Sequence, residues 1–339
     1  MSTDVVSSGA GRIGRYFSVV SALPATVFVS YLYLLFRTGA PTEPVDWSKA
    51  TDFDPAGLAA LGIGALVLAL ALNPLQFPLI QLFEGYWGSS RLAVELALIR
   101  TIHHRQRRRT LIRRHGKARP GLTGRDPRRR YSASPDEIRA GMTADEIQRE
   151  LAAYPEPDLG RELPTRLGNV LRRYEDAIAR PYGLDPLVTV PRLVMVAGQP
   201  EIDYVQNQRV QMELALRTSF LALLATLVTV VVMSSNGAWL LLAAAPYSVA
   251  YLSYRGAVAL AHEYGMSLAV LTDLGRFALY ERLHLPHPPN TLAERQLNRS
   301  LMELFRMNDS AWLTYERPES PAAGTPAPPS DRTPPDAPE

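Results

Sequence analysis

A long apolar segment that ends in a dense arginine run constrains this chain more than any other feature. Residues 56–83 are mostly apolar, and a basic run begins within twenty residues of their end. Between residues 98 and 119 there are nine Arg or Lys side chains, three histidines and no acid. An apolar span followed at once by arginine is typical of a helix that leaves the bilayer on its cytoplasmic side. The junction therefore predicts both a membrane protein and its orientation.

The composition agrees with a membrane protein that carries a large soluble portion. Of the 339 residues, 47% are hydrophobic and 20% are charged, and the apolar residues are clustered. The chain contains no cysteine, which excludes disulfides, thiolate nucleophiles and zinc sites with Cys ligands. The net charge is only +3 because acids elsewhere offset the basic run.

Four segments are predicted to span a membrane, because about twenty apolar residues suffice to cross a bilayer. They are residues 17–36, 56–83, 214–233 and 238–254. A signal peptide is the alternative for the first segment, but Pro24 interrupts it and Arg37 stands where a small-residue cleavage site would be. In the second segment, Asn73, Pro74 and Pro78 are expected to kink or end the helix near the inner interface.

The last two predicted spans form a hairpin, because only the Ser-Ser-Asn-Gly turn at 234–237 separates them. Their strictly apolar parts are short, so we expect Arg217 to snorkel toward the inner interface. A helix that opens near Glu201 should run unbroken into the third span. The fourth span should likewise continue as a helix through residues 255–283.

The charges beside the spans predict their orientation. The loop 38–55 contains one lysine and four acids, whereas Arg12, Arg15 and the basic residues of 91–130 lie on the other side of the spans. By the positive-inside rule, both termini are cytoplasmic, and the protein is a multi-pass protein of a bacterial inner membrane.

The predicted fold class is an all-α polytopic membrane protein, with four transmembrane helices arranged as two hairpins and a helical cytoplasmic domain. Eight prolines and almost no large apolar residues follow Arg317, so we expect a disordered C-terminal tail. The predicted divisions are an N-terminal tail (1–16), a first hairpin (17–84), a basic linker with the helical domain (85–213), a second hairpin (214–255), a helical extension (256–315) and the tail (316–339).

Local signals predict several cytoplasmic helices. A helix capped by Ser89 and Ser90 should dissolve into the arginine run, and residues 116–133 should form a flexible linker. Two short helices should follow, the second opened by a capping box at Thr143–Glu146. A further capping box at Thr291–Glu294 should open a helix near the C-terminus. Residues 187–196 fit either an interfacial segment or a poor strand.

The arginine run has three interpretations. It is a topology determinant alone, or it binds anionic lipid headgroups, each basic residue contributing about 1 kcal/mol near the anionic leaflet. The third interpretation, nucleic-acid binding, ranks last because interleaved aromatic residues and a stacking motif are lacking. The candidate lipid contacts are Arg100, Arg105, Arg107, Arg108, Arg109, Arg113 and Arg114.

A polar face on the helix after the fourth span is the second candidate site. His262 and Asp273 lie eleven residues apart, about three helical turns, and Arg276 and Tyr280 share that face. One interpretation is a metal or acid/base site that includes Glu263. We favour the other, a polar stripe with an Asp–Arg pair that binds this helix to the helix at 165–180.

Two further patterns carry little functional weight. Gly9–Gly14 matches the dinucleotide-binding fingerprint, but no strand precedes it and a predicted span follows, so we interpret the match as coincidence. Ala56, Ala60 and Gly64 recur every four residues, which allows close helix packing within the bundle or between protomers. A homo-oligomer is therefore one expectation.

The sequence therefore predicts a membrane anchor or adaptor, and no enzyme, that recruits a soluble cytoplasmic partner. Catalytic, cofactor and metal constellations are lacking, and no acid, lysine or histidine falls in the centre of a span, which argues against secondary transport. One alternative is an oligomeric pore or membrane-perturbing effector. The other is a lipid-directed enzyme that uses His262, Glu263, Asp273 and Arg276.

Overall fold

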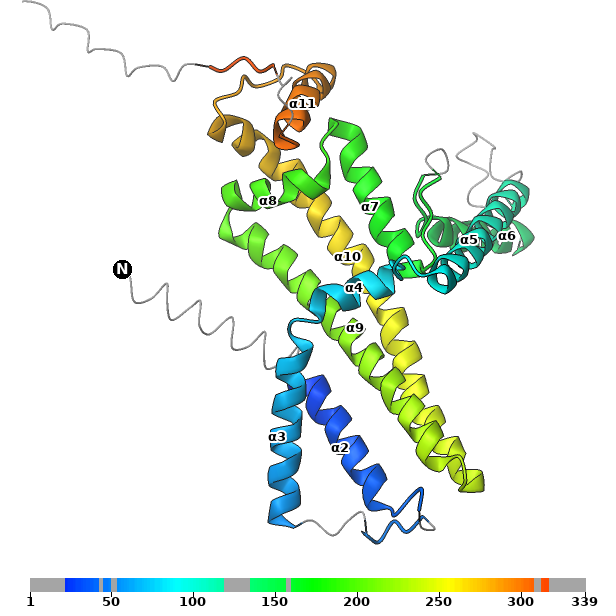
Figure 1. The fold of residues 1–339 in the computed structure, drawn as a ribbon. Helices are drawn as coiled ribbons and strands as arrows, with labels where there is room; N and C mark the ends of the chain where they lie inside the picture. The colour runs from blue at the N-terminus through cyan, green and yellow to red at the C-terminus, as the bar shows by residue number, and fades with distance from the viewer. Residues whose placement is uncertain are drawn as a thin grey trace, which may run out of the picture.

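The computed structural model describes residues 22–42, 45–49, 54–118, 135–156, 160–307 and 312–316. This part of the chain contains ten α-helices, a 3-10 helix and no strand (Figure 1), which confirms the all-α prediction for the described residues. The predicted N-terminal tail with its glycine motif, most of the linker and residues 317–339 lie outside the described residues.

Two antiparallel helices, α9 (Gln199–Met233) and α10 (Ala244–Arg282), run the length of the molecule (Figure 1). Their 35 and 39 residues span about 52 and 58 Å at 1.5 Å per residue. At one end α9 packs with α2 (Leu23–Arg37), which in turn packs with α3 (Pro55–Leu72). At the other end α10 packs with α7 (Arg166–Tyr182) and α8 (Pro186–Val196), and α11 (Thr291–Phe305) packs on α7 and α8.

The first end is apolar on its outside as well as inside. In α3 only Ala65, Ala69 and Leu72 are buried, while apolar side chains over the rest of its surface are exposed. By length and composition, α3 and α9 are two helices that could cross a membrane. We refer to α2, α3, residues 214–233 of α9, the 3-10 helix η5 (Gly237–Ala243) and residues 244–254 of α10 as the apolar half.

The predicted helix breaks and continuations in this region are confirmed. α3 ends at Leu72, and a separate helix, α4 (Gln76–Glu84), begins beyond Pro74. The turn after α9 contains Gly237 at φ +57°, in the left-handed region that glycine adopts readily. The fourth predicted span differs in one respect, because it opens as the 3-10 helix η5 before α10 begins.

Three predictions for the helices of the predicted cytoplasmic domain are wrong. The helix before the arginine run does not dissolve but continues as α5 (Arg91–Ala118), and the two short helices are one, α6 (Pro135–Leu151). Thr143 lies inside α6, where its hydroxyl donates to the Arg139 carbonyl at 2.8 Å. The two long helices persist because they pack on each other through Leu111, Ile147 and Leu151, a contact the local signals do not contain.

The helix predicted to open at the second capping box is confirmed as α11, but Asn290 and not Thr291 caps it, and the undecided segment is also a helix. The side chain of Asn290 caps α11 by accepting from the Leu292 and Ala293 amides, which frees the Glu294 side chain to turn elsewhere. Residues 186–196 form α8, capped by the Asp185 carboxylate, which accepts from the Leu187 amide at 3.1 Å.

Of the three small residues predicted to allow close helix packing on α3, only Gly64 lies at a contact with another described helix of this chain. Ala56 and Ala60 are exposed, whereas a Cβ at Gly64 would lie 3.4 Å from Val29 of α2. A Cβ at Gly57 would lie 2.2 Å from the Tyr33 hydroxyl, so Gly57 is the position of closest approach. Contact of Ala56 and Ala60 with another copy stays a prediction.

Candidate functional site

The predicted polar face of α10 is a buried network that joins α10 to α11. The Arg276 Nε donates to Glu294 Oε1 at 2.8 Å, and the Tyr280 hydroxyl donates to the same carboxylate at 3.1 Å. The Asn298 amide donates to the Tyr280 hydroxyl at 2.8 Å and to the Tyr182 carbonyl at 2.9 Å. The ion pair that was expected between Asp273 and Arg276 is therefore formed with Glu294 instead.

The same network reaches α7, as the favoured interpretation expected. The Tyr182 hydroxyl donates to Asp273 at 2.7 Å, and the Arg276 guanidinium lies 4.3 Å from the centre of the Tyr182 ring. Arg276 also donates to the Asp273 carbonyl. Burial raises the pKa of Tyr280 above its ordinary value of 10, so its hydroxyl, which is protonated at neutral pH in any case, remains a donor in alkaline solution. These groups are engaged with one another, so the network fastens three helices.

Glu294 and Asn298 are the members of this network that sequence reasoning missed. Both are buried, and they lie one turn apart on the face of α11 that also presents Leu301 and Phe305 to the core. A polar pair at helical spacing within an apolar stripe was the signal that could have identified them, because buried polar groups need partners.

His262 belongs to a different contact. Its ring meets the Tyr174 ring of α7 edge-on at 5.9 Å, and burial, aided by Arg173, lowers its pKa. Asp273 lies about 16 Å farther along α10, at 1.5 Å per residue, and Glu263 is exposed. Within the described residues there is no cluster of three or more metal-ligating side chains. The four residues of the enzyme hypothesis thus do not converge on one reaction centre.

The predicted arginine cluster on α5 divides into two groups. Arg105 and Arg108 both pair with Glu162 at 3.1 Å, and Arg107 pairs with Glu150 of α6 at 3.3 Å. Arg108 is only 7% exposed, so it faces the protein and not a lipid surface. Arg108 is therefore a correction to the predicted lipid contacts, whereas lipid contact of the more exposed Arg105 and Arg107 stays a prediction. The other four are exposed and form no ion pair with the described residues: Arg100, Arg109, Arg113 and Arg114.

The face of α5 that carries Arg108 also buries a histidine. His104 is 3% exposed, and its Nδ1 lies 3.1 Å from the Tyr154 hydroxyl. Burial, aided by the nearby Arg100 and His103, lowers the pKa of His104 to about 4. The imidazole is therefore neutral at neutral pH, and it holds α5 against the segment that follows α6.

A buried ionic group lies where the apolar half begins, and it corrects the prediction for Arg217. Glu213 and Arg217 are 1% and 2% exposed, one turn apart on α9. Arg209 donates to Glu213 at 2.8 Å, and Arg217 donates to Gln76 of α4 at 3.0 Å. Arg217 therefore does not snorkel outward, because α4 crosses α9 and supplies a partner inside the protein.

The outer face of α10 carries an exposed apolar stripe that sequence reasoning missed. Met266, Val270, Leu274 and Phe277 recur at three- and four-residue intervals, and each is at least one-third exposed. The acids Glu263, Asp273 and Glu281 lie beside this stripe on the same side of the helix. We call these seven residues the α10 face. The sequence pattern did not reveal this stripe, because apolar residues occur on several sides of α10 and no single side stands out.

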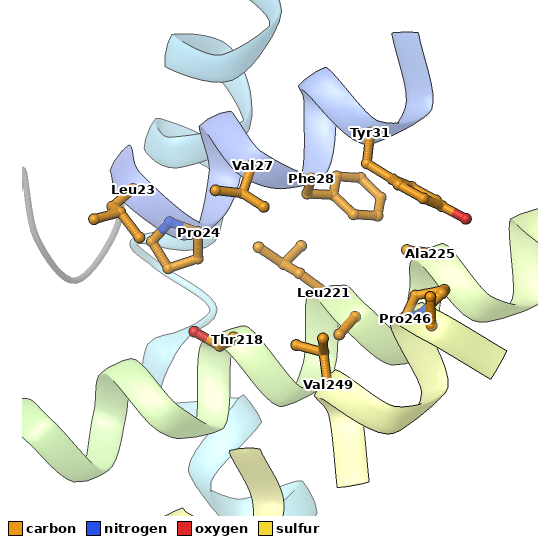
Figure 2. Close-up of a pocket in the computed structure, with 12 residues that line it drawn as sticks. Leu23, Pro24, Val27, Phe28, Tyr31, Thr218, Leu221, Ala225, Pro246 and Val249 are labelled. Atoms are coloured by element: carbon orange, nitrogen blue, oxygen red, sulfur yellow. The ribbon is translucent and has the colours of Figure 1, made fainter. Parts of the chain in front are cut away.

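A groove of about 260 Å³ opens between α2, α9 and α10 in the apolar half. Figure 2 shows Val27 and Phe28 of α2 facing Leu221 of α9, with Val249 of α10 on the opposite wall. The Tyr31 hydroxyl at its edge lies 2.8 Å from the Thr229 hydroxyl, which satisfies it. This lining suits an acyl chain or apolar side chains.

Comparison of the chain with protein-family models, with curated proteins and with solved structures found no match. The function that follows rests on the geometry of this chain.

Proposed function

We propose that this chain is an integral membrane anchor that recruits a soluble partner to the cytoplasmic surface. The apolar half would form four spans, with both termini on the cytoplasmic side. The observation that carries the proposal is the continuity of α9 and α10. Each is one unbroken helix that extends from the apolar half to the end of the molecule where α7, α8 and α11 lie. An anchor needs such rigid coupling to hold a docking face at a set height.

Three features support the membrane position. Residues 214–233 would extend about 30 Å as a helix, which equals the hydrocarbon thickness of a bilayer. The exposed apolar surface of α3 would face lipid. Trp47 and Trp239, from the predicted outer loop and the η5 turn, lie 5.5 Å apart, as expected of aromatic side chains gathered at one interface.

The α10 face is the docking surface in this proposal. It lies outside the apolar half, and its exposed apolar side chains have acids beside them. Apolar anchors give affinity, whereas the flanking charges select a partner of opposite sign. The fitting partner is a soluble protein that presents an amphipathic helix with basic residues along its apolar stripe.

Proximity labelling in the native host tests this function, with the label at the C-terminus. The wild-type chain should enrich one soluble complex, and Leu274→Arg should lose it because a cation then stands among the acids that attract the partner. Leu292→Arg is the matched control, since Leu292 is 67% exposed on α11 and Leu274 is 64% exposed. If both variants enriched the complex equally, the partner would not bind at the α10 face. If the wild-type chain enriched no soluble complex, the proposed adaptor function would be wrong.

A further inference from the structure

The inner face of α5 is buried against other parts of the protein. His104, Arg108 and Leu111 are buried at intervals of four and three residues, so they form one stripe that faces α6 and its following segment. Figure 1 shows α5 and α6 lying together and leaving the bundle sideways at the level of α4. We call this pair the arm.

The opposite side of α5 is apolar and exposed. Its first half carries six apolar side chains that are 44–79% exposed, of which Leu92, Leu98, Ile99 and Ile102 lie opposite the buried stripe and Val94 and Leu96 lie to either side of it. We call these six residues the α5 face. Glu95 is the only acid between residues 91 and 118. A soluble surface rarely leaves so many large apolar residues together without an occupant.

The α5 face lies beside the end of the apolar half. α4 packs there, since Phe83 near its end stacks on Tyr254 at 5.9 Å, and Tyr254 closes the fourth predicted span. Only residues 85–90 separate α4 from α5, and they include Trp87, a residue type common at membrane interfaces. The first turns of α5 are therefore at the height where the predicted spans end.

The charges on α5 specify the occupant. Arg109 and Arg113 lie one turn apart on the exposed side, beyond the apolar residues, whereas Arg100 and Arg114 are exposed on the side of the helix that carries Arg107. None of the four is paired with a described acid, unlike Arg105, Arg107 and Arg108. An apolar face continued by free arginines is complementary to a bilayer surface, whose acyl boundary is apolar and whose headgroups are anionic.

We infer that α5 lies in the cytoplasmic surface of the bilayer, with the α5 face inserted among the lipids and Arg109 and Arg113 against anionic headgroups. This inference rests on the membrane position in the proposed function, but not on the soluble partner. The arm would then be a second membrane contact that sets the rotation of the α10 face relative to the membrane plane. A second copy of the chain, whose acidic α10 face could receive α5, is the competing occupant.

The absence of native cysteine makes a direct test available. Single-cysteine variants of the full-length chain, labelled with bimane, are reconstituted in phosphatidylcholine–phosphatidylglycerol vesicles that contain a nitroxide-labelled lipid. Leu98→Cys probes the α5 face. Leu66→Cys on α3 is the lipid control, and Met195→Cys on α8 is the aqueous control, since both side chains are more than half exposed.

Nitroxide lipid should quench the labels at positions 98 and 66 several-fold more than the label at position 195, and aqueous iodide should show the reverse order. Quenching at 66 with an iodide-accessible label at 98 would overturn the inference alone. No lipid quenching at 66 would overturn the membrane position. A label at 98 that is shielded from both quenchers, and that becomes accessible on dilution of protein in the vesicles, would assign α5 to a second copy and overturn the lipid assignment.

A charge test separates the headgroup contribution from insertion. In the Leu98→Cys background, the double variant R109Q/R113Q should lose most of the increase in lipid quenching that phosphatidylglycerol produces over phosphatidylcholine alone. The matched control R282Q/R299Q removes two exposed arginines from α10 and α11 and should keep that increase. Equal loss in both double variants, or no effect in either, would contradict the assigned role of the α5 arginines.

Discussion

The α5 face and the α10 face are alike in hydrophobicity and opposite in charge. Both present large apolar side chains at helical spacing outside the core, but free arginines follow the α5 face and acids flank the α10 face. Hydrophobic contact is non-directional and does not distinguish lipid from protein. The surrounding charges, and the distance from the apolar half, are the reasons for proposing different partners for the two faces. The lipid contact of the α5 face and the protein contact of the α10 face can therefore be tested by separate substitutions.

The largest effect should come from the network beneath the α10 face. Glu294→Ala leaves Arg276 without its carboxylate and removes an acceptor of the buried Tyr280, so we expect a loss of about 3–5 kcal/mol in unfolding free energy. Limited proteolysis and thermal unfolding should show α11 detaching, together with loss of partner labelling. Lipid quenching at position 98 should be unchanged, and a change there would mean that the two faces are coupled.

Glu263→Ala is the matched control for this prediction, because Glu263 is an exposed acid on the same side of α10. It should change stability by less than about 0.5 kcal/mol. Glu294→Gln keeps an acceptor for Tyr280 and should cost less than Glu294→Ala. Equal losses for Gln and Ala would show that charge, and not hydrogen bonding, accounts for the effect.

The second largest effect should come from loss of Glu162, the acid that pairs with two arginines of the arm. Glu162→Ala strands Arg105 and the buried Arg108, and breaking a pair of this kind costs about 3 kcal/mol. Hydrogen exchange should accelerate in α5 and α6 and stay unchanged in α10. Glu150→Ala removes only the partner of Arg107, at a 35%-exposed carboxylate, and should cost under about 1 kcal/mol. Equal acceleration in both variants would mean that Glu162 is not the residue that holds the arm.

Acid should loosen the arm before it affects the α10 face. His104 has a pKa of about 4 in the folded chain against 6.5 for the free side chain, so the unfolded state binds more protons between those values. Stability of the arm is fully present above pH 6.5 and is lost as the pH falls toward 4. Hydrogen exchange of α5 against pH measures this loss, and His104→Phe should flatten the dependence between these pH values. An unchanged profile in that variant would assign the loosening to another group.

The smallest effect on stability, and a selective one on binding, should follow charge reversal on the α10 face. Glu263→Arg alters an exposed residue, so the unfolding free energy should change by less than about 0.5 kcal/mol. Partner labelling should fall because the flank no longer attracts basic residues, whereas lipid quenching at position 98 should be unaffected. Undiminished labelling would show that the acids do not select the partner.

Much of the fold could be predicted where the signal was local. The Asn73–Pro74 break and the Ser234–Gly237 turn each act within a few residues, through a missing donor or a left-handed backbone, so sequence reasoning placed them correctly. The same logic failed at Thr143 and Glu294. Their capping-box pattern is also local, but a packed neighbouring helix and a stronger cap at Asn290 overrode it.

By itself, the sequence determined an all-helical chain with apolar segments, a basic helix and a polar stripe on the helix at 255–283, because periodicity and charge are properties of the order of residues. Only the tertiary structure decided which charges are free. Seven arginines looked equivalent, and the approach of Glu150 and Glu162 separated three from four. Arg276 likewise found Glu294 and Arg217 found Gln76 across helices. An ion pair or a hydrogen bond depends on distance in space, and residues far apart in the chain come within that distance only when the helices pack.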